Sequence, residues 1–228
     1  MILTYYCAVS MILIAYLLGS IPNAVWIGKK YYGIDIREHG SKNAGTTNML
    51  RVLGKRAALP VFGLDVLKGF VAVTIIDLMK YDSVFADGAN ETWFYILRFI
   101  AVFAAVLGHI FPVFAHFKGG KGVATLVGAV LGIHPITVLL CFGIWFIVLM
   151  ITHYVSLSSM IAGCCFPIFV LLSPKINHSV PLVVFSFVIA ALLIWTHRKN
   201  IDRLKKGTES KIYIWRPVAS RRRNDPDK

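Results

Sequence analysis

The chain has 228 residues, of which 57% are hydrophobic and 15% are charged, and its mean hydropathy is +0.70. Soluble domains are roughly 45–50% apolar and about 25% charged, so this composition excludes an ordinary soluble protein and predicts a polytopic membrane protein. The formal net charge of +13 is compatible with nucleic-acid binding. The basic residues, however, lie in short segments between apolar runs. We therefore attribute them to membrane topology and expect no nucleic-acid partner.

Apolar runs divide the chain into seven predicted membrane spans. These runs cover residues 2–27, 57–79, 93–117, 123–133, 136–152, 156–172 and 181–196. The fourth run is shorter than the roughly 20 residues that a bilayer requires. It ends at His134-Pro135, because the residue before a proline avoids helical angles. The sequence therefore predicts an all-α polytopic membrane protein with seven transmembrane helices, some of them half-length.

Lysine and arginine indicate how these helices are oriented. Of the 24 basic residues, seven follow the first span, two follow the third and eleven follow the last. Cytoplasmic segments carry an excess of such residues. Six spans would place the basic loops and the basic tail on opposite sides, whereas seven place them together. We therefore expect the N-terminus outside the cell and the C-terminus in the cytoplasm.

The helical region and the chain end are expected to form separate parts. Residues 1–206 make up the predicted integral membrane domain. Residues 207–228 make up a basic cytoplasmic tail that closes with SRRRNDPDK, and we expect this tail to be disordered. Each basic residue near anionic headgroups contributes about 1 kcal/mol of attraction, so the tail either touches the lipid surface or stays solvated.

No metal site is predicted. The four cysteines fall inside apolar runs without metal-ligand spacing, so we interpret them as small core residues. His109 and His116 lie seven residues apart on the predicted third span. No pair of carboxylates accompanies them, so we interpret these histidines as hydrogen-bonded packing residues.

A glycine-lysine loop follows the third span. It reads KGGKG and comprises Lys118, Gly119, Gly120, Lys121 and Gly122. Glycines let a backbone approach a ligand closely, and backbone N–H groups with nearby cations at a helix start suit a phosphate. The alternative is a basic turn between two membrane helices. The three interleaved glycines favour a phosphate site at residues 118–121. A P-loop is excluded, because glycine follows the second lysine where that motif needs Ser or Thr.

The first cytoplasmic loop is rich in hydrogen-bonding side chains. Its hydroxyl and amide groups, followed by one guanidinium, belong to Ser41, Asn43, Thr46, Thr47, Asn48 and Arg51. A guanidinium suits bidentate contact with phosphate. A solvated loop with turn residues explains this stretch equally well when it is taken alone. Because the glycine-lysine loop lies on the same side of the membrane, we favour one polyanion site shared by both loops.

Two residue pairs with a spacing of three lie on or beside the predicted spans. Asp65 and Lys68 share one helical face, and charges at membrane depth usually face the interior and pair. We expect an intrahelical ion pair, with a substrate contact from Lys68 as the alternative. His197 and Asn200 emerge together at the cytoplasmic end of the last span.

Six stretches together resemble the bacterial acyl-phosphate-dependent glycerol-3-phosphate acyltransferases. They read AYLLGSIP, GSKNAGTTNMLRVLGK, LDVLKG, GHIFPVFAHFKGGKGVAT, YVSLSS and HRKNIDRL, and lie within residues 15–206. The resemblance implies seven helices, a cytoplasmic active site and a place in the bacterial inner membrane. It also implies transfer of a fatty acyl group from acyl-phosphate to position 1 of glycerol 3-phosphate. The products are lysophosphatidic acid and phosphate, which places the reaction in phospholipid synthesis.

The resemblance also implies roles for single residues. The functional serine, arginine and second loop lysine of that family match Ser41, Arg51 and Lys121. Its histidine and asparagine match His197 and Asn200. We take the first four as catalytic. We expect the following residues to bind substrate: Asn43, Thr46, Thr47, Asn48, Lys118, Gly119, Gly120 and Asn200. We expect His197 to orient substrate in the first place and to act as a base in the second, since a substrate phosphate oxygen can also take the proton.

The residues fit this chemistry independently. Acyl-phosphate is a mixed anhydride with a good leaving group, so catalysis can rest on positioning and charge stabilisation without a covalent nucleophile. Arg51, Lys118 and Lys121 can offset the phosphate charges, so we expect neither metal nor cofactor. The expected partners are glycerol 3-phosphate, acyl-phosphate, the lipid bilayer and the soluble enzyme that makes acyl-phosphate.

A membrane transporter of an organophosphate or other anion is the alternative function. It would use the same loops to bind its cargo without chemistry. Transporters often contain paired broken helices in two similar halves. Only the run over residues 123–152 is broken here, so we favour the enzyme.

Overall fold

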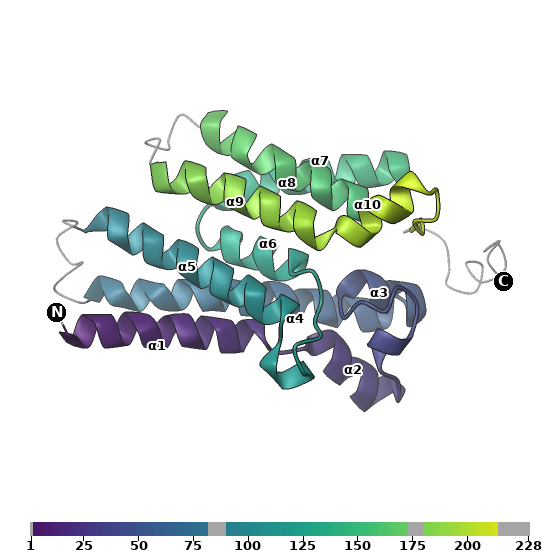
Figure 1. Cartoon of the computed structure of the whole chain (residues 1–228), viewed down its shortest axis with the longest axis horizontal. Coiled ribbons are helices and arrows are strands. Elements are labelled where there is room, and N and C mark those ends of the chain that lie inside the picture. The colour runs from purple at the N-terminus through teal and green to yellow at the C-terminus, as the bar shows by residue number, and fades with distance from the viewer. Residues whose placement is uncertain (1, 82–89, 173–179, 214–228) are drawn as a thin grey trace.

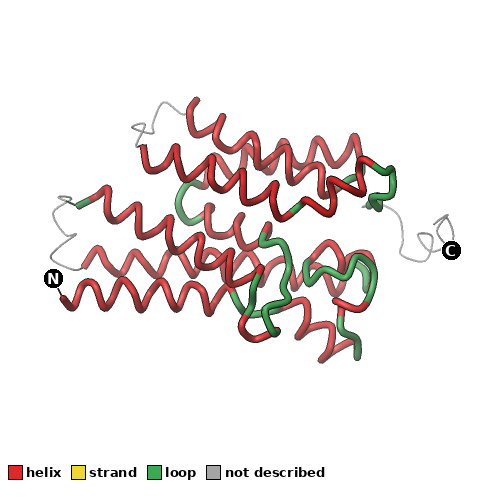
Figure 2. The backbone as a smooth tube through the Cα atoms, viewed as in Figure 1, coloured by secondary structure: helices red, strands yellow, loops and turns green. Residues whose placement is uncertain are grey.

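The computed structural model describes residues 2–81, 90–172 and 180–213. Within these ranges every regular element is a helix, with ten α-helices and three short 3-10 helices (Figure 2). This arrangement confirms the predicted all-α class.

Two groups of helices lie one above the other, with a half-length helix between them (Figure 1). The first group contains α1 (Ile2–Gly19), α4 (Lys55–Thr74) and α5 (Glu91–Ile110). The second contains α7 (Pro135–Thr152), α8 (Val155–Leu172) and α9 (Val180–Thr196). The half-length helix is α6 (Val123–Leu131). The three remaining α-helices, α2 (Asn23–Tyr32), α3 (Thr46–Val52) and α10 (Arg198–Lys205), gather at one end of the molecule.

Length and composition identify the membrane spans among the described residues. Five helices qualify, and they cover Ile2–Tyr32, Lys55–Tyr81, Glu91–Ala115, Pro135–Thr152 and Val155–Leu172. The bent pair of α9 and α10, which meet at an angle of 57°, is a sixth candidate if the two helices are counted as one span. The nine-residue α6 matches the predicted half-length helix. The protein is therefore a multi-pass membrane protein with five or six candidate spans among the described residues, and the number of seven stays a prediction.

The predicted break at His134-Pro135 is confirmed, and two other predicted spans are broken where the sequence predicted a continuous helix. His134 occupies the N-cap of α7, and Pro135 is its first residue. The third span was expected to reach residue 117, but α5 ends at Ile110. Pro112 follows, and a proline there has no N–H with which to continue the helix. The first span also divides, at Pro22, into α1 and α2.

Small residues bring α4 and α6 into backbone contact. A Cβ at Gly69 would overlap the carbonyl oxygen of Thr125, and one at Gly128 would overlap that of Val66. Close approach over small residues is a common way to associate helices in a membrane. This contact holds α6 firmly against α4, which matters because the N-terminus of α6 faces the cavity described below.

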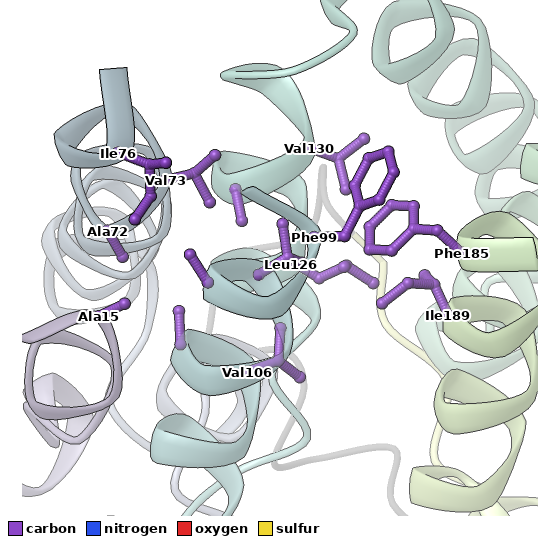
Figure 3. Packing of buried hydrophobic residues seen from close by; sticks show 14 of the residues in the cluster. Ala15, Ala72, Val73, Ile76, Phe99, Val106, Leu126, Val130, Phe185 and Ile189 are labelled. Atoms are coloured by element: carbon purple, nitrogen blue, oxygen red, sulfur yellow. The ribbon is translucent and has the colours of Figure 1, made fainter. Parts of the chain in front are cut away.

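Aromatic side chains join the two groups of helices. The rings of Phe99 on α5 and Phe185 on α9 stack with their centroids 4.4 Å apart. Figure 3 shows this pair beside Val130, with Leu126 and Ile189 packed next to it. The core therefore continues from the first group through α6 into the second.

The chain beyond α10 returns to the helical body. The backbone N–H of Ile212 donates to the carbonyl of His153 at 2.8 Å, and the Ile212 side chain is buried. Residues 207–213, which the sequence assigned to a disordered tail, are thus ordered against the junction of α7 and α8. The rest of that predicted tail lies outside the described residues.

Candidate active site

A cavity of about 380 Å³ opens at the end of the molecule where α3 and α10 lie. It lies between the two groups of helices and is lined from both. The structure brings nine predicted site residues to its wall: Ser41, Asn43, Thr46, Thr47, Asn48, Arg51, Lys121, His197 and Asn200. Lys118, Gly119 and Gly120 are absent from the lining. Segments more than 140 residues apart in the sequence therefore form one polar site.

The C-terminal part of the glycine-lysine loop lines the cavity, whereas the sequence predicted that residues 118–120 would do so as well. The N–H of Gly119 donates to Ile110 at 3.2 Å, and the N–H of Gly120 donates to His109 at 3.1 Å. These two groups are therefore occupied within the protein. The cavity is lined instead by Lys121 and the residues that start α6. A helix start carries free N–H groups and a partial positive charge, so this segment is the anion-facing part of the loop.

Lys121 provides a cation in this wall. Its side chain is half-buried, and burial lowers the pKa of its ammonium group from 10.5 to about 8. Glu209 opposes this change, whereas Arg203 and Arg51 add to it. At neutral pH the group is therefore still mainly protonated and suited to hold a phosphate.

Asn48 organises the first loop. Its Oδ1 accepts from the backbone N–H of Ser41 at 2.9 Å. Its Nδ2 lies within hydrogen-bond distance of the carbonyls of Ile36, His39 and Asn43. The side chain is only 1% exposed. The sequence assigned Asn48 to substrate binding, but its amide is used to shape the loop that carries the neighbouring hydroxyls.

His197 lines the cavity and carries one ring nitrogen that can accept a hydrogen bond. Its Nδ1 lies 2.8 Å from the carbonyl oxygen of Leu193. A carbonyl oxygen can only accept, so we assign the proton of the neutral ring to Nδ1. Nε2 is then unprotonated. The ring is 2% exposed and lies where α9 bends into α10.

Asn200 presents an acceptor as well. Its Nδ2 donates to Oε1 of Glu209 at 2.6 Å. Because an ionised carboxylate only accepts, this bond fixes the orientation of the amide. Oδ1 of Asn200 is buried and has no hydrogen-bond partner within the described residues. Oγ1 of Thr46 is likewise buried with no hydrogen-bond partner in the part of the chain that the structure describes, so the wall holds polar atoms that a ligand can satisfy.

Sequence reasoning missed Glu209, which lies in the segment assigned to the tail. Its carboxylate accepts hydrogen bonds from Ser156 at 2.7 Å, Asn200 at 2.6 Å and Arg203 at 2.7 Å. Burial alone would raise the pKa of Glu209, but the bonds from Arg203, Ser156 and Asn200 outweigh burial and lower it. All four residues line the cavity. The available signal was a single carboxylate in the otherwise basic run 203–211.

The predicted ion pair is confirmed. Lys68 Nζ lies 2.8 Å from Asp65 Oδ1, and both side chains are buried. Asn23 donates to the same carboxylate at 2.9 Å, and Lys68 also donates to the carbonyl of Ile21 at 2.7 Å. Asp65 lines the cavity, whereas Lys68 does not. The pair therefore ties α4 to the start of α2.

The part of the cavity that runs between the helices is apolar. Side chains from α6, α7, α8 and α9 line it, among them Leu126, Val130, Val138, Phe142, Trp145, Phe166 and Ile189. Trp145 donates to Ser159 at 3.2 Å and so links α7 to α8 along this wall. The fold and the cavity together define a multi-pass helical membrane protein whose site suits an anion with an apolar chain.

Comparison with known proteins identifies the family. The family model described as glycerol-3-phosphate acyltransferase matches residues 9–207. The glycerol-3-phosphate acyltransferase of Staphylococcus carnosus is 45% identical, with 90% of this chain and 97% of the relative covered. That of Chlorobium phaeobacteroides is 38% identical, with 91% and 97% covered. The chain belongs to the glycerol-3-phosphate acyltransferase family.

Solved structures agree with this assignment. One is a crystal structure of PlsY (YgiH), an integral membrane glycerol 3-phosphate acyltransferase, in its glycerol 3-phosphate form. It is 38% identical to this chain with a TM-score of 0.76, and the match covers 90% of this chain and 96% of the other. The lysophosphatidic acid form of the same protein is 37% identical, with a TM-score of 0.74 and coverage of 91% and 96%.

Proposed function

We propose that the protein transfers a fatty acyl group from acyl-phosphate to position 1 of glycerol 3-phosphate, giving lysophosphatidic acid and phosphate. The observation that carries this proposal is the cavity, which joins cations and helix N–H groups at one end to an apolar wall between helices. Glycerol 3-phosphate suits the polar end. An acyl-phosphate suits both parts, because its chain is apolar and its headgroup is a phosphate.

The cationic wall supports binding of the phosphates. Arg51 and Lys121 line it together with the start of α6. Guanidinium groups suit bidentate phosphate contact, and an ammonium acts as a point charge. As the acyl group leaves phosphate, negative charge develops on the departing oxygen, and fixed positive groups stabilise it. We therefore assign Arg51 and Lys121 to charge stabilisation.

The acceptor wall supports binding of the glycerol hydroxyls. Nε2 of His197 and Oδ1 of Asn200 can each accept an O–H. The attacking hydroxyl oxygen forms a bond to the acyl carbon, and the bond from that carbon to the phosphate oxygen breaks. The hydroxyl proton passes to a phosphate oxygen or to Nε2. His197 and Asn200 thus orient the nucleophile opposite the cations.

Ser41 is assigned to substrate binding. Its backbone N–H is held by Asn48, and its side chain lines the cavity. A serine nucleophile needs an adjacent general base. Ser41 has no histidine or carboxylate among its hydrogen-bond partners within the described residues. Direct transfer between the two substrates needs no acyl-enzyme.

We place the enzyme in the bacterial cytoplasmic membrane with its cavity open to the cytoplasm. The basic residues of the first loop and of α10 lie at the cavity end of the molecule, and such residues mark the cytoplasmic side. A donor with a long acyl chain would reach this end through the bilayer. The soluble enzyme that makes acyl-phosphate is a fitting partner, since its product must pass into the apolar part of the cavity.

Purified protein tests the proposal most directly. Labelled glycerol 3-phosphate is incubated with palmitoyl-phosphate or with palmitoyl-coenzyme A, and lysophosphatidic acid is measured. We expect product from the phosphate donor only, because the described residues offer no nucleotide pocket beside this cavity. Comparable rates with both donors would contradict the donor assignment. Uptake of glycerol 3-phosphate into proteoliposomes without any product would favour a transporter instead.

A further inference from the structure

A strained turn precedes the glycine-lysine loop. His116 and Phe117 adopt φ angles of 54° and 58°, in the left-handed region that side chains disfavour. Both side chains are exposed, Phe117 by 59%. Packing of these two side chains therefore does not offset the strain, and some other contact must hold the turn.

Arg37 contacts the backbone on both sides of this turn. Its Nη1 donates to the carbonyl of Ala115 at 2.9 Å and, at a longer 3.4 Å, to the carbonyl of Lys118. These carbonyls flank His116 and Phe117 directly. Arg37 itself lies 78 positions before Ala115 and 81 before Lys118 in the sequence.

The guanidinium is itself held in place. Its Nε and Nη2 donate to the two carboxylate oxygens of Asp35 at 2.9 and 2.6 Å. Asp35 also accepts from the backbone N–H of Arg37 at 3.0 Å and pairs with Lys29 at 3.2 Å. The bidentate contact with Arg37 is the main reason that the pKa of Asp35 lies below its usual range. Both partners are therefore charged at neutral pH.

The two segments that Arg37 joins lead directly to the two halves of the polar site. Residues 35–38 precede the loop with Ser41 and Arg51, and residues 115–118 precede Lys121. The segments also touch further on, since a Cβ at Gly120 would lie 2.9 Å from the carbonyl oxygen of Ala44. A change in the turn would therefore move Lys121 relative to the first loop.

We infer that Arg37 is a positioning residue that holds the strained turn and thereby sets Lys121 against the first loop for phosphate binding. This inference rests on the proposed function. Arg37 does not line the cavity, so it acts through the backbone of the turn.

Substitution of Arg37 tests the inference. Arg37→Gln removes the charge and the fork, and we expect the KM for glycerol 3-phosphate to rise about 10- to 100-fold, as for loss of one or two charge-assisted hydrogen bonds. The value of kcat should fall as well, by a smaller factor, because Lys121 also stabilises the charge on the departing phosphate. Arg37→Lys keeps the charge but not the fork and should give an intermediate KM. Lys29→Gln is the matched control, because it removes the other cation on Asp35 and leaves the turn untouched; its KM should stay within about twofold.

Glycine at the turn provides a specific rescue. Phe117→Gly relieves the left-handed strain, because glycine adopts positive φ without steric cost. In the Arg37→Gln background it should recover a KM several-fold closer to wild type, and alone it should change the KM by less than about twofold. Absence of any rescue would contradict the role of strain.

Limited proteolysis measures how readily the turn opens, and it does not require enzyme activity. In Arg37→Gln, trypsin should cleave after the exposed Lys118 at least several-fold faster than in wild type, since proteolysis follows local opening. The inference is wrong if the wild type is active and Arg37→Gln has the same KM and the same cleavage rate as the wild type. A fall in kcat with unchanged KM would also contradict it. An inactive wild type would instead contradict the proposed function, while the proteolysis would still decide whether Arg37 holds the turn.

Discussion

Arg51 and Lys121 hold a phosphate in different ways, and substitution separates the two. Arg51→Lys keeps the charge and loses the planar fork, whereas Lys121→Ala loses the charge outright. We expect either change to reduce kcat/KM by about 10- to 100-fold, as for charge-assisted hydrogen bonds worth about 1.5–3 kcal/mol. Steady-state assays with both substrates measure this. Lys55→Ala, an exposed cation outside the cavity lining, is the control and should stay near wild type.

The pKa of Lys121 predicts how activity depends on pH. Burial lowers this pKa to about 8 in the free protein, so the phosphate-binding cation is lost as the pH rises through that value. We expect kcat/KM to fall above about pH 8. Bound phosphate favours the charged form, so the fall in kcat should lie at higher pH.

Lys121→Arg provides the check on that pH profile. Arginine stays protonated throughout the accessible range, so the alkaline fall in kcat/KM should disappear or move upward. If the fall stays near pH 8 in this variant, another group controls it.

Ser41 distinguishes direct transfer from a covalent mechanism. If its hydroxyl only binds substrate, Ser41→Ala should cost about 1–3 kcal/mol in kcat/KM. A nucleophilic serine would instead leave activity near background and give an acyl-enzyme burst. Mass spectrometry after brief exposure to acyl-phosphate measures the second outcome. An acylated Ser41 that turns over at the catalytic rate would contradict our assignment.

At the scale of elements, the segment after α10 forms part of the site. Glu209 holds Ser156, Asn200 and Arg203, and Ile212 bonds to the junction of α7 and α8. This segment therefore fixes the acceptor wall of the cavity, and α10 depends on it for its orientation against α8.

Two truncations test this role. Removal of residues 214–228 keeps the hydrogen bonds of Glu209 with Ser156, Asn200 and Arg203, so we expect activity within about twofold of wild type. Removal of residues 207–228 leaves Ser156 and Asn200 without their carboxylate, and loss of such buried bonds costs several times 1–3 kcal/mol. That variant should lose most of its activity and melt at a lower temperature in detergent. Equal activities of the two would show that the segment is dispensable.

At the scale of the whole molecule, the orientation in the membrane follows from charge. In a background without its four cysteines, Lys42→Cys and Glu91→Cys place one thiol at each end of the helices; both positions are exposed. We expect a membrane-impermeant reagent to label position 91 in intact cells and position 42 only after permeabilisation. Position 88, in the predicted outside loop between the second and third spans, would serve the same purpose but lies outside the described residues. The reverse pattern would place the cavity outside the cell.

The sequence by itself determined the features that depend on local composition. Hydropathy identified the long apolar helices, because each must satisfy its backbone within the membrane, but it gave no signal for the polar helices α3 and α10. Pro135 marked the break between α6 and α7, since proline restricts the residue before it. The pair Asp65 and Lys68 followed from helical spacing. The loops with Ser41 and Lys121 stood out because polar residues and glycines interrupt apolar runs.

Only the tertiary structure decided which of the polar groups face the cavity. The N–H of Gly120 is occupied by His109, and the amide of Asn48 is occupied by its own loop. Glu209 joined the site through Ser156, which is 53 residues away in the sequence. Such bonds are set by how the helices pack. The residues alone reveal that a group can donate or accept, but its partner is chosen by the nearest group that the fold supplies.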